Sequence, residues 1–384
     1  MPSPSPKASI ADALNGWLEQ RASAMEELLI QLVSLETPSQ DPPRLEPAYD
    51  LLGERLSRLG MRQSRSAGAL VATSSPARAP WQMLVGHADT VWPVGTLQTF
   101  PVERRGELLR GPGVYDMKAG LVQMIYALEA LHALELSPAL PLVVVINGDE
   151  EIGSPRSARL LLQLARRATR AFVLEPSLGS TGKLKTARKG GGRFRVKIQG
   201  IPAHAGLSPE QGASAILELS YVIQDLFQLN DLSRGVTVNV GVVDGGLRPN
   251  VVAPHSSADV DVRVPTHQEA ERVEQKLRSL RARIPGVSLT VEGGWGRPPM
   301  EPTPRNLALF ERARELGMLL GLELEGGAAG GSSDGSTLSQ VTAVLDGLGA
   351  VGDGAHSLEE HCLPAHMPIR AALLALLLLS APEG

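Results

Sequence analysis

The sequence predicts an α/β protein with a mostly parallel sheet, interrupted by a smaller α+β domain. Three observations predict this fold. Short apolar strands alternate with helical stretches through the first 175 residues, which is the arrangement of a parallel sheet. Between residues 193 and 292 the order changes to strand, helix, two strands, helix and strand, as in a ferredoxin-like β-α-β-β-α-β unit. Helices and the α/β pattern then return through Leu379.

In the first region, helices are expected at residues 9–35, 46–59, 116–134 (after its first turn) and 154–167. Apolar residues at helical spacing predict the first of these, and Gly60 is placed to end the second. Strands are expected at residues 81–85, 142–146 and 171–174, because these are short apolar runs, the second of them rich in β-branched residues.

In the second region, Gly190, Gly191 and Gly192 predict a hinge or turn. Strands are expected at residues 193–199, 236–243, 257–264 and 287–292, and helices at 212–229 and 267–282. The inserted domain is therefore expected to span residues 189–298, and residues 1–188 and 299–384 to form the domain around it.

Composition excludes several classes of protein. A hydrophobic fraction of 43% and a net charge of −4 argue against wholesale disorder and against a chain that mainly binds phosphate backbones. The single cysteine, Cys362, excludes an intramolecular disulfide and a multi-thiolate metal site. The N-terminus lacks a signal-peptide pattern, and the longest apolar run, residues 371–379, is too short to span a bilayer and predicts a buried helix. We expect a soluble cytoplasmic protein.

Acidic and histidine residues follow the three strands predicted in the first region. His87 and Asp89 come after the first strand, Glu150 and Glu151 after the second, and Glu175 after the third. Ligands of open parallel sheets bind beyond the carboxyl ends of the strands, so these side chains are expected to converge. Carboxylates and imidazoles suit a divalent metal such as zinc. The set exceeds the three protein ligands that one zinc needs, which favours two metals.

Three segments resemble the signature of a known family. They are His-Ala-Asp-Thr-Val at residues 87–91, Gly-Pro-Gly-Val-Tyr-Asp-Met-Lys-Ala-Gly at 111–120 and Asp-Glu-Glu-Ile-Gly-Ser at 149–154. Together they resemble the dinuclear zinc peptidases and amidohydrolases, which include glutamate carboxypeptidase, acetylornithine deacetylase, succinyl-diaminopimelate desuccinylase and aminoacylase. The resemblance extends from about Leu28 to Leu379. It implies a zinc hydrolase domain with an inserted lid and dimerisation domain.

The resemblance also implies the metal ligands. Asp116, in the Gly-rich turn, would bridge two zinc ions, with cobalt or manganese as alternatives. His87 and Glu175 would complete one site, and Glu151 and His356 the other.

Three further residues receive catalytic roles from the resemblance. Asp89 would orient the His87 imidazole. Glu150 would be the general base that activates a metal-bridging water and passes the proton to the leaving amine. His204 of the inserted domain would reach the partner subunit's site and stabilise the tetrahedral oxyanion, which implies a homodimer.

Asn250 and Arg263 resemble positions that contact the terminal carboxylate of the substrate in glutamate carboxypeptidase-like members, a role that suits the planar guanidinium of arginine. Lys183 and Arg297 are candidates to hold a second carboxylate. The chain is therefore predicted to cleave the amide bond of an N-acylated amino acid or of a C-terminal residue, with glutamate favoured. The alternative is an N-acyl-amino-acid deacylase such as acetylornithine deacetylase or succinyl-diaminopimelate desuccinylase.

Two other classes of function are less favoured. A non-catalytic binding protein of the same fold would not need the five ligand candidates together with Glu150. Nucleic-acid binding through the basic residues 183–197 is opposed by the net charge of −4 and by the presence of one aromatic residue, Phe194, in that stretch. We expect a small-molecule substrate and neither a nucleic-acid nor a membrane partner.

Overall fold

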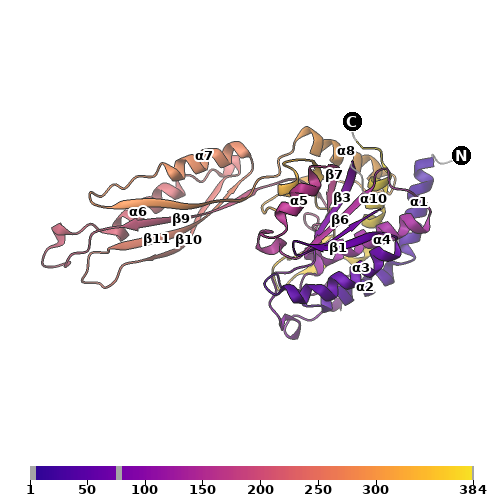
Figure 1. Ribbon diagram of the computed structural model, residues 1–384, viewed down its shortest axis with the longest axis horizontal. Helices are drawn as coiled ribbons and strands as arrows, with labels where there is room; N and C mark the ends of the chain where they lie inside the picture. The colour runs from indigo at the N-terminus through magenta and orange to yellow at the C-terminus, as the bar shows by residue number, and fades with distance from the viewer. Residues whose placement is uncertain (1–5, 75–79, 383–384) are drawn as a thin grey trace. The chain divides into compact units, whose positions relative to one another are not determined.

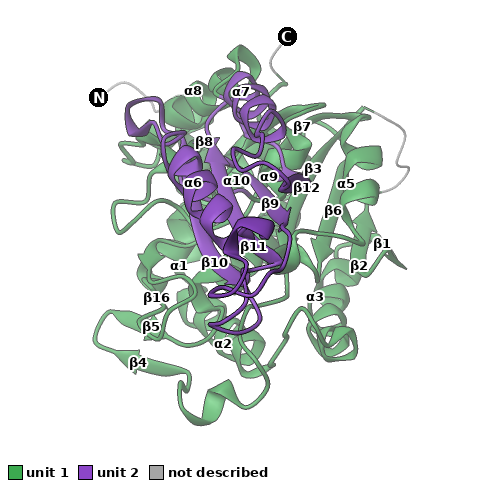
Figure 2. Cartoon of the chain, turned by 90° about the vertical axis from the view of Figure 1, so that its left-hand side faces the viewer, with its two compact units in different colours: residues 1–186, 302–329, 333–384 green, residues 187–301, 330–332 purple. Residues whose placement is uncertain are grey.

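The computed structural model describes residues 6–74 and 80–382 (Figure 1). The chain forms two compact units, coloured separately in Figure 2. Unit 1 comprises Met1–Thr186, Pro302–Ala329 and Ser333–Gly384, and unit 2 comprises Ala187–Glu301 and Gly330–Ser332. Each unit has its own hydrophobic core. The insert expected at residues 189–298 falls within unit 2.

Unit 1 is built on a six-stranded sheet of order β1-β2-β6-β3-β7-β14. The strands are β1 (Arg62–Ser66), β2 (Ala69–Thr73), β3 (Trp81–His87), β6 (Leu142–Asn147), β7 (Ala168–Val173) and β14 (Ala343–Leu345). Strands β6, β3, β7 and β14 pair with one another in parallel. Strands β1 and β2 form an antiparallel hairpin, and β2 pairs antiparallel with β6. Every residue of β3 and β6 is buried, because helices cover both faces of a parallel sheet.

The helices of unit 1 surround this sheet (Figure 1). They are α1 (Pro6–Glu19), α2 (Ala22–Ser34), α3 (Glu46–Arg58), α4 (Ala119–Ala133), α5 (Ala158–Ala165), α8 (Pro304–Met318), α9 (Asp334–Leu338) and α10 (Met367–Leu379). Helix α10 is almost wholly buried and packs against α1, α4 and α8, which confirms the predicted buried helix at residues 371–379. Among the described residues, no helix is both long and apolar enough to cross a membrane.

Shorter strands complete unit 1 and bring distant segments together. A second sheet has the order β15-β16-β5-β4 and is formed by β4 (Glu103–Arg105), β5 (Leu108–Arg110), β15 (Gly352–Asp353) and β16 (His361–Cys362). A two-stranded sheet pairs β8 (Leu184–Arg188) with β13 (Gly326–Ala329). Since β16 pairs with β5, the second sheet holds the turn after residue 110 beside the loop at residues 354–360.

Unit 2 has the predicted β-α-β-β-α-β order. It consists of β9 (Gly190–Gln199), α6 (Ala215–Phe227), β10 (Thr237–Gly245), β11 (His255–Val264), α7 (His267–Arg278) and β12 (Ser288–Arg297). The sheet order is β10-β11-β9-β12, with antiparallel neighbours throughout. Alternate residues of β9, such as Val196, are buried in a core shared with α6 and α7, and the residues between them are exposed. The mixed α/β class predicted from the sequence is confirmed.

The single helix predicted at residues 9–35 is wrong, because the chain leaves the helix at Gln20 and Arg21. Arg21 has φ −113° and ψ 10°, and its guanidinium donates to the carbonyl oxygen of Trp17 at 2.9 Å. This bond satisfies one of the last carbonyls of α1, which have no partner within the helix. The apolar residues keep their spacing across the break, so periodicity does not reveal it.

The hinge or turn predicted at Gly190, Gly191 and Gly192 is also wrong. These residues open strand β9 and pair with the end of β11. A Cβ atom at Gly190 would lie 2.7 Å from the nitrogen of Pro299, and one at Gly192 would lie 2.9 Å from the ring of Trp295. The glycines therefore permit close packing within a strand, one of the roles that glycine has in sheets.

Candidate functional site

The predicted ligands converge at one edge of the main sheet of unit 1. His87 is the last residue of β3, whereas the sequence predicted that it would follow the strand. Glu150 and Glu151 lie in a short 3₁₀ turn, Glu150–Ile152, after β6, and Glu175 follows β7. The strands β3, β6 and β7 are parallel, so their carboxyl ends share an edge, where ligands of such sheets bind.

Asp116 connects two groups of ligand candidates. Its Oδ1 lies 3.3 Å from Nε2 of His87, and its Oδ2 lies 3.4 Å from Nε2 of His356. The same nitrogen of His87 is 3.4 Å from Oε1 of Glu175, and that of His356 is 3.1 Å from Oε2 of Glu151. Each oxygen of Asp116 thus faces a different imidazole, as expected of a carboxylate that bridges two cations.

The donor set fits divalent cations. Ligands placed tetrahedrally around zinc at its usual bond lengths lie about 3.3 Å apart, and the four contacts above span 3.1 to 3.4 Å. His87 Nε2, Asp116 Oδ1 and Glu151 Oε1 are buried and have no hydrogen-bond partner. Buried polar atoms normally have partners, and two cations that share Asp116 would satisfy all three. Two triads, His87–Glu150–Glu175 and His87–Asp116–Glu151, each have ligand atoms within 4.8 Å of one another.

Protons are held between these side chains when no cation is present. Hydrogen bonds to Asp116 and then Glu151 raise the pKa of His356 to about 11. Burial raises the pKa of Glu151 to about 7. Burial opposes the charged form of Asp116 too, but the nearby imidazoles of His356 and His87 outweigh it and hold the pKa of Asp116 below its ordinary value. A carboxylate-rich cluster with few positive partners is the environment that a divalent cation stabilises.

Asp89 is fully buried and forms hydrogen bonds with residues of this cluster. Its main-chain carbonyl lies 3.0 Å from Nδ1 of His87, which leaves Nε2 of that ring to face Asp116. Its carboxylate accepts the Ser39 hydroxyl at 2.6 Å and the backbone N–H groups of Glu150 and Glu151, both at 3.2 Å. Asp89 therefore fixes three candidate site residues at once.

The adjacent glutamates act on different sides of the cluster. Glu150 is buried and groups with His87 and Glu175, whereas Glu151 contacts His356. Glu150 is placed where a general base could act, and it is also close enough to His87 and Glu175 to share a metal ion with them.

Lys185 is a site residue that the sequence does not single out. Its Nζ lies 3.7 Å from Oε2 of Glu175, and both side chains are 9% exposed. The predicted Lys183 instead pairs with Glu325 at 2.6 Å, with both side chains well exposed. Lys183 immediately precedes β8, and Lys185 is the second residue of that strand. Because the apolar pattern around them is weak, the strand that buries Lys185 is not recognisable from the sequence.

The candidates in unit 2 fall into two groups. His204 pairs with Val251 in an isolated bridge, and the Asn250 carbonyl accepts the N–H of Ala205 at 3.0 Å, so His204 and Asn250 lie together beyond the end of β11 that begins at His255. Arg263 and Arg297 both pair with Gly191, at the other end of the sheet. Arg263 is eight residues after His255, which is about 27 Å along the strand.

Hydrogen bonds fix the tautomer of His204 and occupy the guanidinium of Arg263. Nδ1 of His204 accepts the N–H groups of Gly206 and Leu207 at 3.2 and 3.1 Å, so the ring proton belongs on Nε2. The guanidinium of Arg263 binds both carboxylate oxygens of Asp261, at 2.8 and 3.0 Å. His204 therefore presents a donor, while Arg263 already holds a carboxylate.

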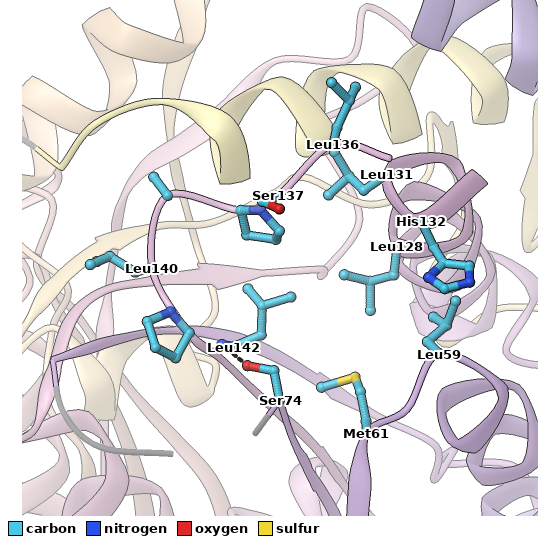
Figure 3. A pocket seen from close by; sticks show the side chains of 13 residues that line it. Leu59, Met61, Ser74, Leu128, Leu131, His132, Leu136, Ser137, Leu140 and Leu142 are labelled. Carbon is cyan, nitrogen blue, oxygen red and sulfur yellow. Dashed lines mark hydrogen bonds between the residues drawn. The ribbon is translucent and has the colours of Figure 1, made fainter. Parts of the chain in front are cut away.

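A cavity of about 380 Å³ lies elsewhere in unit 1 (Figure 3). Its lining includes six leucines, together with Met61, Ser74, His132 and the segment 137–141. It includes Leu142, the first residue of β6, whereas Glu150 follows the last residue of that strand. The cavity is thus at the opposite end of β6 from the predicted ligands and takes no part in the site.

Residues 83–380 match the protein family described as Peptidase family M20/M25/M40. The chain is similar to carboxypeptidase G2 of Pseudomonas sp. (strain RS-16), with 26% identity over 375 residues that cover 94% of this chain and 90% of that one. It is 27% identical to succinyl-diaminopimelate desuccinylase of Delftia acidovorans, over 90% of this chain and 95% of that one. It is 31% identical to acetylornithine deacetylase of Myxococcus xanthus, over 68% of this chain and 72% of that one.

Solved structures share the fold. Aminopeptidase PepT from Bacillus cereus superposes with a TM-score of 0.75 at 20% identity, over 93% of this chain and 98% of that one. A dinuclear metal binding peptidase of the M20 family from Bacillus subtilis has a TM-score of 0.69 at 13% identity, over 93% and 97% of the two chains. The resemblance predicted from the three motifs is confirmed.

Proposed function

This chain belongs to peptidase family M20/M25/M40, and we propose that it is a dinuclear metal-dependent hydrolase of amide bonds. The observation that carries the proposal is the bridging geometry of Asp116, whose two oxygens face two different imidazoles. One ion would be held by His87, Asp116 and Glu175, and the other by Asp116, Glu151 and His356. When bound, such ions polarise the scissile carbonyl and acidify a water molecule. We propose zinc, with cobalt or manganese as alternatives.

Glu150 is proposed as the general base. Its N–H is held by the buried carboxylate of Asp89, so the start of its side chain is fixed relative to His87. Glu150 would take a proton from the attacking water and deliver it to the leaving amine. A positioned general base typically contributes about 10² to 10⁴ in rate.

His204 is proposed to donate a hydrogen bond from Nε2 to the oxyanion that forms at the scissile carbonyl. The two N–H groups that Nδ1 accepts fix the required tautomer. Removing one such donor typically lowers kcat by about 10² to 10³.

A homodimer follows if both groups of unit 2 candidates serve catalysis. His204 and Asn250 are separated from Arg263 and Arg297 by about 27 Å along the strands, which exceeds the length of a small substrate. One substrate can then contact both groups only if two copies of unit 2 contribute. The edge strand β10 carries the exposed residues Val242 and Val243, and an unpaired strand edge is a surface that a second copy could cover.

We propose N-acylated amino acids or C-terminal residues as the substrate class, with glutamate favoured. Asn250 and Arg263 are the proposed partners of the terminal carboxylate, and Lys183 and Arg297 of a second carboxylate; Lys183 and Arg263 would have to exchange their present carboxylate partners, Glu325 and Asp261. The alternative is an N-acyl-amino-acid deacylase, supported by the 31% identity to acetylornithine deacetylase. Under both proposals the scissile amide lies next to a carboxylate that arginine can bind.

A side-by-side assay separates the two proposals. We expect acyl-glutamates and dipeptides ending in glutamate to give a higher kcat/KM than acetylornithine or succinyl-diaminopimelate. Turnover of acetylornithine alone would contradict the preference for glutamate.

The role of Glu150 is tested by Glu150→Gln, with Glu107→Gln as a matched control at an exposed position. We expect kcat to fall by at least about 100-fold in the first variant, with an unchanged metal content, and to stay the same in the second. A Glu150→Gln enzyme that retains wild-type turnover would refute the mechanism.

A further inference from the structure

Glu360 is a buried carboxylate that the proposed mechanism does not use. Its side chain lies in the loop between β15 and β16, and the residue is 1% exposed. No lysine or arginine pairs with it among the described salt bridges. A buried carboxylate without a cationic partner is costly unless hydrogen bonds stabilise it, so its partners indicate what holds it there.

Four N–H groups converge on this carboxylate. Oε1 accepts the backbone N–H groups of Tyr115 and Asp116, both at 3.1 Å. Oε2 accepts the backbone N–H of Gly113 at 3.0 Å and the indole N–H of Trp92 at 2.9 Å. Three of the four donors belong to the turn that carries Asp116. These three backbone N–H groups lie at the start of the short helical turn Val114–Lys118, where N–H groups have no intrahelical partner.

The main chain of Glu360 belongs to the loop that carries His356. Its N–H donates to the carbonyl of Ser357 at 3.0 Å, and its own carbonyl accepts the N–H of Gly111 at 3.4 Å. The next residue, His361, pairs with Arg110 across β16 and β5. Glu360 therefore joins the His356 loop to the Asp116 turn through both its main chain and its side chain.

We propose that Glu360 is a positioning residue that locks the Asp116 turn to the His356 loop and so sets the geometry of the metal site that these two side chains share. This inference rests on the proposed dinuclear function. Asp116 and His356 are 240 residues apart in sequence, and their facing atoms are 3.4 Å apart. Small displacements of either segment change that distance directly.

Glutamine at position 360 keeps the shape of the side chain but has only one acceptor oxygen. The NH₂ of its amide would replace one carboxylate oxygen and would face two N–H donors that this oxygen accepts in the wild type. At least two of the four hydrogen bonds are lost in either orientation of the amide. Removing hydrogen-bond partners of metal ligands typically lowers metal affinity by about 10- to 100-fold.

The test is titration of metal-free protein with Co²⁺, followed by visible absorption. Wild type, Glu360→Gln and the control Glu359→Gln are compared; Glu359 is the neighbouring glutamate, with its side chain 83% exposed. We expect Glu360→Gln to weaken the binding of both ions, because Asp116 would contact both, and to weaken the ion shared with His356 by about 10- to 100-fold, with a changed d–d spectrum. A purely structural role would lower the melting temperature of the metal-free protein and leave the spectrum unchanged.

The outcomes separate this inference from the proposed function. Wild-type protein that binds two ions, together with a Glu360→Gln variant of unchanged affinity and spectrum, overturns the role of Glu360 alone. Wild-type protein that binds fewer than two ions overturns the dinuclear function and this inference with it. If Glu360→Gln does not fold, Trp92→Phe removes one donor and keeps the carboxylate. We then expect a loss of affinity of about two- to tenfold, and an unchanged affinity overturns the inference.

Discussion

Replacing Gly120 by alanine is expected to displace a proposed metal ligand, Glu175, that Gly120 does not touch. Gly120 lies in the first turn of α4, and a Cβ atom there would come 2.0 Å from the carbonyl oxygen of Leu174 and 3.1 Å from its carbonyl carbon. Carbon and oxygen atoms that are not bonded rarely approach within about 3 Å, so the helix and the strand end must separate by about 1 Å. Leu174 immediately precedes Glu175, whose Oε1 is 3.4 Å from His87 Nε2.

This displacement sets the size of the expected effects. Overpacking of this kind typically costs about 1 to 3 kcal/mol of stability, and a misplacement of about 1 Å in a catalytic site can cost about 100-fold in rate. Gly16→Ala is the matched control, because a Cβ at Gly16 in α1 meets nothing within 4 Å. That variant is expected to gain up to about 1 kcal/mol, since alanine is the better helix former.

Urea unfolding, metal affinity by competition with a chelator, and amide hydrolysis are measured for both variants. We expect Gly120→Ala to lose stability, to bind one metal ion more weakly and to lose most of its activity. Wild-type stability and metal affinity in Gly120→Ala would refute the argument that α4 and the Glu175 strand end are in close contact.

Three further predictions concern the same cluster. Asp89→Asn cannot accept the N–H groups of both Glu150 and Glu151 as the carboxylate does, so we expect metal affinity to fall by about 10- to 100-fold; isothermal titration with Zn²⁺ checks this, and an unchanged affinity would argue against the positioning role of Asp89. In metal-free protein the pKa of His356 is raised to about 11 and that of Glu151 to about 7, so at pH 7 His356 holds a proton and Glu151 is about half protonated. Metal loading is therefore expected to release protons and to tighten as the pH rises from about 6 to 8; a pH indicator in weak buffer measures the release, and its absence would contradict the assignment of these two ligands. Removal of metal by a chelator is expected to abolish hydrolysis and lower the melting temperature, because the ions bind only the folded cluster; full activity after verified metal removal would count against a metal-dependent reaction.

Much of the site is predictable because it depends on local sequence and on one rule of topology. The apolar runs at residues 81–85 and 142–146 are short, β-branched or bulky, and bounded by polar residues, so the strands themselves are recognisable. Parallel strands bring their carboxyl ends to one edge. The convergence of His87, Glu150 and Glu175 therefore follows from the amino-acid sequence together with this rule.

Other features depend on contacts between distant segments. The hairpin of β1 and β2 is not predictable in this way, since β1 is a largely exposed, polar strand without apolar alternation. Gly190 to Gly192 resemble a turn in sequence, and only the nearness of Pro299 and Trp295 explains their place in β9. The role of Glu360 likewise depends on the pairing of β16 with β5, because its hydrogen bonds reach segments about 245 residues away.

Asp116 is proposed to bridge two metal ions. Anomalous diffraction from crystals grown with zinc, recorded on both sides of the zinc absorption edge, tests it most directly. We predict two peaks about 3.5–4 Å apart, one beside His87 and Glu175 and the other beside Glu151 and His356, with one carboxylate oxygen of Asp116 directed at each. A single peak, or two peaks that Asp116 does not join, would contradict the account.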